Sequence, residues 1–530
     1  MGKKRAARRR SPVVPMDTVK ASVVVFISSF CTLVIELVAG RILAPHVGVS
    51  LYTWTSIIGV VLAGISLGAY LGGTMADRYP RASTLGWLLF LSGLGAFAIS
   101  PLINLVGAAR FHTPLMIQIL ITTAIIFFVP SCLLGMISPV VVKLALQNLQ
   151  RTGNVVGKIY AFSTLGSILG TFATGFFLIS WMGTRNILFA TGAILVLCAP
   201  IFGGFFMRKT TLGVFFLIFI PLLLGFYGTA FKPPLEEGTF LFKESNYYTI
   251  QLRKSGGAPD PQLITLYIDN LTHSCTALDD PSHLVYRYIR VYDEVLRWQA
   301  RKRESFRTLF IGGGGYTFPR YVEARYPKAD IDVVEIDPEI TRVSLAHLGV
   351  RKDTRIRTFN TDGRWFVMNH REKEKYDFIF LDAFNDLSVP FHLTTKEFSL
   401  QLKKLLKPDG LLLVNVIDSF DKGAFLPSYT RTLEEVFAKG KVHLITLSSS
   451  EEHIGVSNSV VMASPQALDV EDFNRSLKST GNEETISHVM PPDRLQRYLN
   501  ERHSMILTDD YVPVDNLIAP VFEELYGYKR

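Results

Sequence analysis

The sequence divides into an apolar half and a charged half near Phe231. Up to that residue it consists of long apolar runs separated by short polar segments, and beyond it charged residues, Asp-Gly turns and short apolar segments alternate. A helix that crosses a bilayer needs roughly 20 consecutive apolar residues, whereas the second pattern is typical of a globular α/β domain. With 530 residues the chain is also too long for one ordinary domain. We therefore expect an α-helical transmembrane domain over 19–231, followed by a soluble half.

Seven apolar runs are candidates for membrane spans. They cover about 20–43, 54–74, 85–106, 115–146, 156–181, 186–206 and 212–230. Glycines recur in two of these runs at the spacing of helix-packing positions: Gly64, Gly68, Gly72, Gly166, Gly170 and Gly175. Small residues let helix backbones approach closely in lipid, although membrane helices are also rich in glycine for other reasons.

Positive charge is concentrated in the first 20 residues. This segment holds seven basic residues and one acidic residue, so it carries +6 of the formal net charge of +9. The remaining +3 does not indicate a nucleic-acid-binding surface. Because cytoplasmic segments beside membrane spans are rich in Lys and Arg, we predict that residues 1–18 form a basic cytoplasmic tail. The chain is then a multi-pass protein of the cell membrane, in contact with the lipid bilayer.

The four cysteines give no sign of a metal site or of a disulfide framework. Three of them, Cys31, Cys132 and Cys198, lie in apolar runs, and Cys275 alone lies in the charged half. No CxxC pair occurs, and such pairs are the usual signature of zinc ligands. We therefore predict that the protein uses no metal.

The charged half contains a βαβ pattern with a glycine turn and a well-placed acid. A short apolar segment, 308–311, ends in Gly312, Gly313, Gly314 and Gly315, and a second predicted strand, 330–337, ends in the acids Glu335 and Asp337. Glu335 follows Gly312 by 23 residues, close to the ~20 found in dinucleotide-binding folds. There the glycines let the backbone approach the nucleotide and the acid accepts the ribose hydroxyls. This pattern predicts a nucleotide-cofactor site at Gly312, Gly313, Gly314, Glu335 and Asp337.

Two further predicted strand ends carry acids. Asp362 and Gly363 precede an apolar helix, and Asp382 is the last residue of a predicted strand over 376–382. In doubly wound sheets, ligands bind where the carboxyl ends of the strands gather. Asp362 can then face the adenine, and Asp382 points into the same crevice, although each acid alone could also be a turn former or a helix cap.

The quoted residues carry a resemblance to a known family. The pattern GGGG…VVEID…TDGRWF…YDFIFLDAF…LTTKEFSLQLKKLLKPDGLLLVNV resembles the spermidine synthase (polyamine aminopropyltransferase) family over about 240–465. The preceding YYTIQL…LYIDNLTHSCTALDD…YRYI is similar to that family's small N-terminal β-domain. The membrane half resembles the multi-spanning region fused to such domains in some prokaryotes. The resemblance implies a small β-domain at 240–295 and a Rossmann-like S-adenosylmethionine-binding domain at 296–530.

The resemblance also implies roles for individual residues. The donor is decarboxylated S-adenosylmethionine, with its ribose held by Glu335 and its adenine side by Asp362. Asp382 accepts a proton from the attacking amine, because a protonated amine is not a nucleophile. A small-molecule amine is then the second substrate, and assembly as a homodimer through the catalytic domain is an expectation from the family.

The acceptor side departs from the family pattern. The fourth loop glycine, Gly315, replaces the acid of GGGDG, and Asn385 replaces the second acid of DSSDP, with Asp386 beside it. His273 stands where the β-domain has a glutamine, and Tyr286 begins a stretch that has lost the acid of YxE. Of these, His273, Tyr286, Asn385 and Asp386 are the candidates for the acceptor pocket. A pocket for a dication needs several carboxylates, so cofactor binding is better supported than diamine binding.

Three functions therefore stay open at this stage. The leading one is a membrane-bound aminopropyltransferase-like enzyme. The second is a transferase that moves the methyl or another group of S-adenosylmethionine to a different acceptor. The third is a transporter whose soluble half is a nucleotide-binding regulator. The side of the membrane is open too, because seven spans place the soluble half outside while these donors are made in the cytosol.

Overall fold

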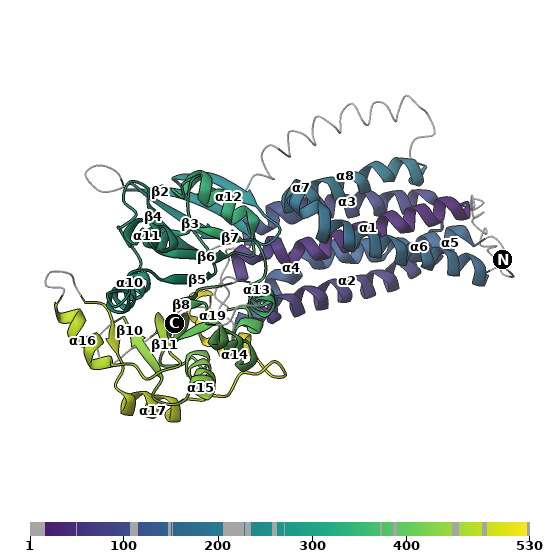
Figure 1. Ribbon diagram of the computed structural model, residues 1–530. Helices are drawn as coiled ribbons and strands as arrows, with labels where there is room; N and C mark the ends of the chain where they lie inside the picture. The colour runs from purple at the N-terminus through teal and green to yellow at the C-terminus, as the bar shows by residue number, and fades with distance from the viewer. Residues whose placement is uncertain are drawn as a thin grey trace, which may run out of the picture. The chain divides into compact units, whose positions relative to one another are not determined.

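Figure 1 shows the computed structural model of the chain. It describes residues 16–48, 50–106, 115–146, 150, 152–204, 227, 235–256, 262–269, 271–370, 374–384, 389–447, 455–479 and 485–526. The chain separates into two compact units, one formed by Met1–Phe111 with Met116–Pro234 and the other by His112–Leu115 with Leu235–Arg530. The first is helical and the second is an α/β unit, and each is described by itself below.

The helical unit contains six helices long and apolar enough to cross a membrane. They cover Thr18–Val47, Leu51–Arg78, Ala82–Val106, Met116–Ala145, Thr152–Met182 and Thr184–Gly203. In finer division the elements are α1 (Thr18–Val47), α2 (Leu51–Arg78), α3 (Ala82–Val106), α4 (Leu115–Gly135), α5 (Ile137–Ala145), α6 (Thr152–Ala173), η2 (Thr174–Leu178), α7 (Ile179–Met182) and α8 (Thr184–Gly203). The first six predicted spans are thus helices. The seventh, 212–230, lies outside the described residues except for Tyr227, as do residues 1–15 of the predicted basic tail.

Most of the predicted glycine positions are close helix contacts. A Cβ at Gly68 would lie 2.1 Å from the carbonyl oxygen of Cys132, so the backbones of α2 and α4 are in direct contact here. A Cβ at Gly166 would lie 2.3 Å from the carbonyl oxygen of Phe26, which joins α6 to α1 in the same way. Such contacts are typical of membrane helix pairs. The prediction is wrong for Gly175, where a Cβ would meet nothing within 4 Å.

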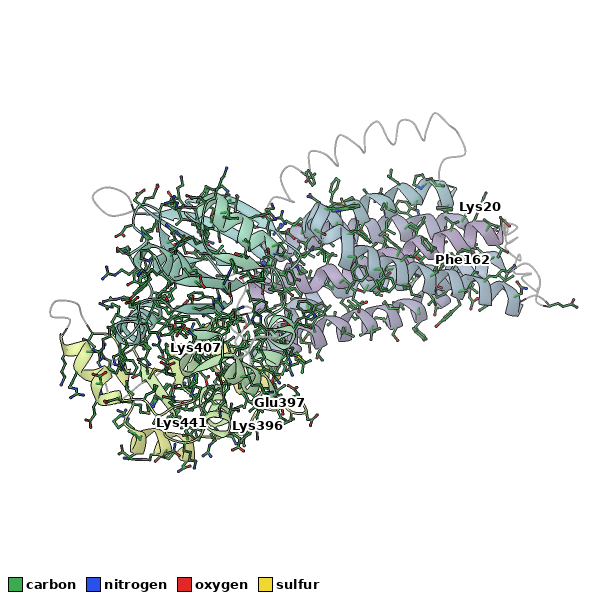
Figure 2. The ribbon with its side chains drawn as sticks, viewed as in Figure 1. Lys20, Phe162, Lys396, Glu397, Lys407 and Lys441 are labelled. Atoms are coloured by element: carbon green, nitrogen blue, oxygen red, sulfur yellow. The ribbon has the colours of Figure 1, made fainter. Side chains whose placement is uncertain are left out.

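Large apolar side chains cover part of the outside of the helical unit, as Phe162 illustrates in Figure 2. Along α6 and η2 the exposed ones are Tyr160, Phe162, Leu165, Ile168, Leu169, Phe172, Phe176 and Phe177. An apolar surface of this kind is unfavourable in water and suits lipid. In the α/β unit the side chains labelled in Figure 2 are Lys396, Glu397, Lys407 and Lys441.

The α/β unit begins with a four-stranded antiparallel sheet in the order β1-β2-β3-β4. Its strands are β1 (Thr239–Glu244), β2 (Thr249–Ser255), β3 (Leu263–Ile268) and β4 (Leu271–Ala277). Along β3 every second side chain is buried, which is the pattern of a sheet with one covered face. The covered face packs on Ile340, Val343 and Leu348 at and just beyond helix α12 (Pro338–His347).

The second sheet has eight strands in the order β12-β10-β11-β9-β8-β5-β6-β7. They are β5 (Arg307–Ile311), β6 (Asp330–Val334), β7 (Arg357–Phe359), β8 (Tyr376–Leu381), β9 (Leu406–Ser419), β10 (Val442–Thr446), β11 (Val456–Ala463) and β12 (His488–Val489). Strands β5 to β9 are parallel to one another, whereas β11 pairs antiparallel with β9 and with β10, and β10 pairs antiparallel with β12. In this order β6 lies on one side of β5 and β8 lies on its other side. The direction in which the chain adds strands to the sheet therefore reverses between β5 and β8. Ligands of doubly wound sheets bind beyond the carboxyl ends of the strands at that point.

Helices complete the α/β unit. Besides α12, they are α10 (Arg287–Ala300), α11 (Thr317–Arg325), α13 (Gly363–Asn369), η3 (Phe391–Leu393), α14 (Lys396–Leu405), α15 (Phe425–Phe437), α16 (Val470–Ser479), α17 (Pro492–Glu501), α18 (Val514–Leu517) and α19 (Ala519–Tyr526). The predicted Rossmann-type α/β fold of the C-terminal half is confirmed.

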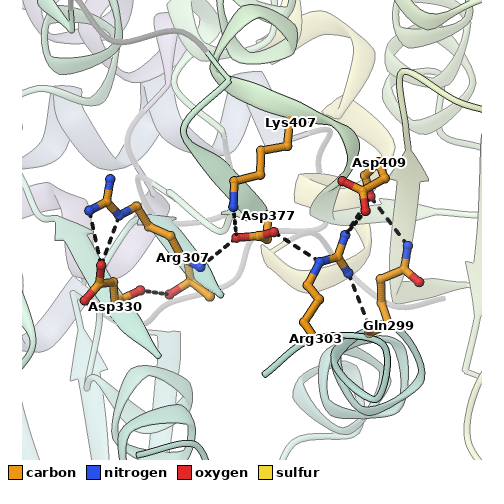
Figure 3. A network of polar contacts seen from close by, with 8 residues as sticks. Gln299, Arg303, Arg307, Asp330, Asp377, Lys407 and Asp409 are labelled. Atoms are coloured by element: carbon orange, nitrogen blue, oxygen red, sulfur yellow. Dashed lines mark hydrogen bonds and ion pairs between the residues drawn. The ribbon is translucent and has the colours of Figure 1, made fainter. Parts of the chain in front are cut away.

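A polar network fixes the amino ends of the central strands (Figure 3). The buried carboxylate of Asp377, in β8, lies 3.1 Å from Arg303 Nε and 2.8 Å from Lys407 Nζ. It also accepts the backbone N–H of Arg307 at 2.8 Å. Two cations and a backbone donor offset the cost of burying this charge. The network ties β5, β8 and β9 together at the edge of the sheet opposite to their carboxyl ends.

Candidate functional site

The glycine loop begins directly after β5. Gly312 has a φ of +99°, and a Cβ there would lie 2.2 Å from the carbonyl oxygen of Asp382. Gly314 has a φ of +46°. These two positions therefore need glycine, the first for both space and backbone angle and the second for its angle. The sequence prediction of a tight glycine turn at the end of a strand is correct.

Glu335 holds this loop in place. Its Oε2 accepts the backbone N–H groups of Gly313 at 2.8 Å and Gly314 at 3.1 Å, and its Oε1 accepts the N–H of Asp337 at 3.0 Å. Burial raises the pKa of Glu335, while the three backbone donors act in the opposite direction. A carboxylate has about four lone-pair sites, so one remains for a further donor such as a ribose hydroxyl.

Asp337 has a structural position that the sequence did not predict. Its carboxylate caps α12 by accepting the N–H of Glu339 at 2.9 Å, and it also accepts the hydroxyl of Ser245. Asp337 is 1% exposed and does not line either of the cavities described below. It connects the two sheets of the unit, and this position does not support the predicted contact with a cofactor.

Asp362 caps the next helix and faces a histidine. Its Oδ1 accepts the N–H of Trp365 at 2.8 Å at the start of α13, and its Oδ2 lies 2.8 Å from His392 Nε2. The helix start packs tightly on β5, because a Cβ at Gly363 would lie 2.7 Å from Ile311 Cγ2. Sequence reasoning missed His392, which is 30 residues away in η3.

Two cavities meet at the carboxyl ends of the strands. The first, here called the Glu335 cavity, has a volume of about 250 Å³ and is lined by Glu335, Asp362, Gly363, His392 and Tyr247, among others. The second, here called the tyrosine cavity, has a volume of about 270 Å³ and is lined by Tyr286, Tyr288, Tyr292 and the glycine loop. Five residues line both: His273, Gly312, Gly314, Asp382 and Phe384.

Asp382 stands where the two cavities meet, directly after β8. Its Oδ2 accepts the hydroxyl of Tyr288 at 3.0 Å, and its Oδ1 accepts the amide of Asn415 at 2.9 Å. The side-chain oxygen of Asn415 in turn accepts the amide of Asn458 at 2.9 Å. The pKa of Asp382 is raised above its ordinary value because the carboxyl group is buried, and the two hydrogen bonds offset part of this rise. The sequence did not predict these partners, but Asn415 was visible as the polar residue inside the apolar strand LLLVNV.

Two of the four predicted acceptor residues line the tyrosine cavity, namely His273 and Tyr286. Burial lowers the pKa of His273 to about 4, so the imidazole is neutral at physiological pH. The other two, Asn385 and Asp386, lie outside the described residues. Among the residues that the structure describes, no group of three or more His, Cys, Asp or Glu side chains is placed to hold a metal ion.

Comparison with known proteins finds relatives for this half of the chain. Residues 300–454 match the family model of the spermine/spermidine synthase domain. A probable polyamine aminopropyl transferase of Bifidobacterium longum is 30% identical over 244 residues, which are 43% of this chain and 52% of the relative. The chain thus spans about half the length of this relative. The predicted resemblance is confirmed: the C-terminal half carries a spermine/spermidine synthase domain.

A second relative aligns over more of the chain. Polyamine aminopropyltransferase 2 of Aquifex aeolicus is 24% identical over 429 residues, or 78% of this chain and 82% of the relative. An alignment of that length must extend into the helical half. Among solved structures, a probable spermidine synthase from Corynebacterium glutamicum has 21% identity and a TM-score of 0.45, covering 52% of this chain and 97% of the other.

Proposed function

We propose that the chain is a membrane-embedded aminopropyltransferase that moves the aminopropyl group of decarboxylated S-adenosylmethionine to an amine. The observation that carries this proposal is the position of Asp382. It is the carboxylate that lines both cavities, and Tyr288 and Asn415 fix its orientation. A base between a donor site and an acceptor site is what this transfer requires.

The Glu335 cavity is the donor site of this proposal. Glu335 offers a free acceptor position toward the ribose, and Asp362 lies on the adenine side with His392 beside it. The glycine loop exposes backbone rather than side chains, so a nucleoside can approach it closely. These roles agree with those of the matching acids in the family that the sequence resembles.

The tyrosine cavity is the acceptor site. Asp382 takes a proton from the amine of the acceptor. The amine nitrogen then attacks the aminopropyl carbon that is bound to the sulfonium sulfur. The C–N bond forms as the C–S bond breaks, and the bonding electrons neutralise the sulfur, which leaves as methylthioadenosine. Because burial raises its pKa, Asp382 is a stronger base than an exposed aspartate.

Product analysis with the full-length protein in detergent tests the proposal. The protein is incubated with an amine and labelled decarboxylated S-adenosylmethionine or labelled S-adenosylmethionine in parallel reactions. Methylthioadenosine formed from the decarboxylated donor supports aminopropyl transfer. If neither donor is consumed, the transferase proposal is wrong and a regulatory nucleotide-binding role takes its place.

Methyl transfer is the second candidate, and the loop position Gly315 favours it. Aminopropyl transfer brings an ammonium group on the donor, whereas Gly315 offers no side chain and the buried hydroxyl of Ser274 fills the adjoining space. An uncharged methyl group needs no carboxylate at that position. Release of S-adenosylhomocysteine from S-adenosylmethionine identifies this reaction.

The membrane part of the proposal rests on the helical unit. Six apolar helices of sufficient length and the exposed apolar side chains along α6 support insertion into a bilayer. The number of spans decides on which side of the membrane the α/β unit lies. With six spans it lies on the same side as the N-terminus, and with the seventh predicted span, 212–230, it lies on the opposite side.

A further inference from the structure

Two side-chain amides connect strand β11 with Asp382. Asn458, in β11, donates its amide N–H to the side-chain oxygen of Asn415 at 2.9 Å. Asn415, in β9, donates its own amide N–H to Asp382 Oδ1 at 2.9 Å. The sheet order is β11-β9-β8, and Asp382 directly follows β8. A polar group two strands away therefore reaches the carboxylate of the proposed base through one intermediate side chain.

The hydrogen bonds of this chain of amides run in one direction. An ionised carboxylate accepts hydrogen bonds and donates none, so Asn415 must turn its NH₂ group toward Asp382. The oxygen of Asn415 then faces Asn458, which must act as the donor. If the amide of Asn415 were turned over, its oxygen would face Oδ1 of Asp382, and two acceptors make no hydrogen bond. Asn458 thus selects one of the two orientations of the Asn415 amide.

Burial makes this selection matter. Asn415 is 3% exposed, so bulk water does not reach its amide freely. A buried amide oxygen without a partner is costly, and Asn458 provides the hydrogen bond that this oxygen needs. An Asn415 amide turned over would suit a protonated Asp382, which can donate, and not the ionised form. The orientation of Asn415 is therefore coupled to the protonation of Asp382.

Asp382 is also held from its other side. Its Oδ2 accepts the hydroxyl of Tyr288 at 3.0 Å. Burial has the largest effect on the pKa of Asp382 and raises it, while the hydrogen bonds from Asn415 and Tyr288 lower it. The titratable side chains that line the two cavities with Asp382 are His273 of β4, Glu335 after β6, Asp362 before α13, His392 of η3 and the tyrosines Tyr247, Tyr248, Tyr286, Tyr288 and Tyr292.

We propose that Asn458 is a positioning residue of the transfer reaction. Its amide holds Asn415 in the orientation that donates a hydrogen bond to Asp382, and the carboxylate is thereby kept ready to accept the proton of the attacking amine. Asn458 acts on the base through Asn415 and not by direct contact. This inference rests on the proposed function, since it treats Asp382 as the base.

Infrared spectroscopy of the full-length protein in detergent tests the proposal without any turnover. A protonated carboxyl group has a C=O stretching band that its ionised form lacks, and the band that is missing from Asp382→Asn belongs to Asp382. The midpoint is the pH at which half of this band has disappeared. Asn458→Leu nearly keeps the size of the side chain and removes its donor, so we expect the midpoint to rise by at least about 0.5 pH unit. An unchanged midpoint in the folded variant overturns the proposal.

A second variant and a control accompany this titration. Asn458→Ala removes the same donor and is used if Asn458→Leu does not fold. The control is Asn474→Leu, the same substitution at an exposed position of α16 that is not among the described lining residues of either cavity. It should leave the midpoint of Asp382 unchanged.

A double-variant cycle tests whether Asn458 acts through Asn415. Asn415→Leu removes a hydrogen bond to a charged group, so the midpoint of Asp382 should rise by about 1–2 pH units. If Asn458 acts through Asn415, adding Asn458→Leu to Asn415→Leu should have no further effect. Equal midpoints in Asn415→Leu and in the double variant support the proposal. A further rise as large as that of Asn458→Leu alone overturns it.

Turnover connects this position with the reaction. The pH dependence of kcat/KM is measured with decarboxylated S-adenosylmethionine and with butane-1,4-diamine as the probe amine. In Asn458→Leu its acidic limb should move to higher pH by the same amount as the infrared midpoint. A limb that stays in place overturns the proposal. Failure of the proposed function gives a different result: the wild type then consumes neither donor, while the infrared midpoints still decide whether Asn458 acts on Asp382.

Discussion

Glu335 Oε2 accepts the backbone N–H of Gly313 at 2.8 Å, so the acid after β6 and the glycine loop after β5 hold each other in position. Glu335→Ala therefore removes a support of the loop as well as a contact to the donor. A hydrogen bond to a charged group contributes roughly 1.5–3 kcal/mol, so affinity for methylthioadenosine should fall about 10- to 150-fold. Calorimetry measures this change, and an unchanged affinity contradicts the assignment.

Asp337→Ala is the matched control for Glu335. Because Asp337 caps α12 and accepts the hydroxyl of Ser245, its loss should lower the free energy of unfolding by about 1 kcal/mol or more. The folded variant should bind methylthioadenosine nearly as well as the wild type. A large loss of affinity for methylthioadenosine without a fall in the free energy of unfolding would support the predicted contact between Asp337 and the cofactor.

Asp382→Asn should reduce turnover far more than donor binding. The substitution keeps the size of the side chain but removes the proton acceptor, so the rate should fall by roughly 10²–10⁴. Single-turnover kinetics with the decarboxylated donor measures the rate, and calorimetry with methylthioadenosine measures binding. Wild-type turnover in this variant would mean that the base is another residue.

The pH dependence of kcat/KM should report the ionisation of Asp382. Burial raises its pKa, and the base works only when deprotonated, so activity should fall as the pH drops through this raised pKa. The hydroxyl of Tyr288 stabilises the charged form. Tyr288→Phe should therefore move the acidic limb of the profile to higher pH. A limb that stays in place in Tyr288→Phe, or that persists in Asp382→Asn, would exclude Asp382 as its origin.

The exclusion between Gly315 and Ser274 predicts a compensating pair of substitutions. In Gly315→Ala the new Cβ would lie 2.0 Å from Ser274 Oγ, so the free energy of unfolding should fall by about 1–3 kcal/mol. Adding Ser274→Gly removes the clash and should recover most of this loss. Thermal unfolding of the two single variants and the double variant forms the test. Additive effects would show that the two positions do not share space.

The number of membrane spans can be measured with reporters fused after Arg530. Seven spans and a cytoplasmic N-terminus place the C-terminus outside, so a reporter active only outside the cytosol should be active. Activity of a cytosol-only reporter alone would contradict the seventh predicted span, 212–230, and leave the six helices that the structure describes.

The sequence by itself determined the long apolar helices of the first half and the strand ends that carry the glycine loop and the acids. Apolar runs of sufficient length predicted the six described long helices, because length and hydropathy are local properties. The glycine turn at 312–314 and the acids Glu335, Asp362 and Asp382 were also predicted, since each lies at or just beyond the end of a short predicted strand.

Only the tertiary structure decided which side chains act on one another. Asn415 reaches Asp382 because β8 and β9 are parallel neighbours, and His392 reaches Asp362 from a 3₁₀-helix 30 residues away. The different hydrogen-bond partners of Glu335 and Asp337 are equally invisible in the sequence, where both are acids after the same strand. Hydrogen-bond partners depend on distances of about 3 Å between side chains far apart in the chain. Such distances are fixed by strand order and helix packing, which no local pattern encodes.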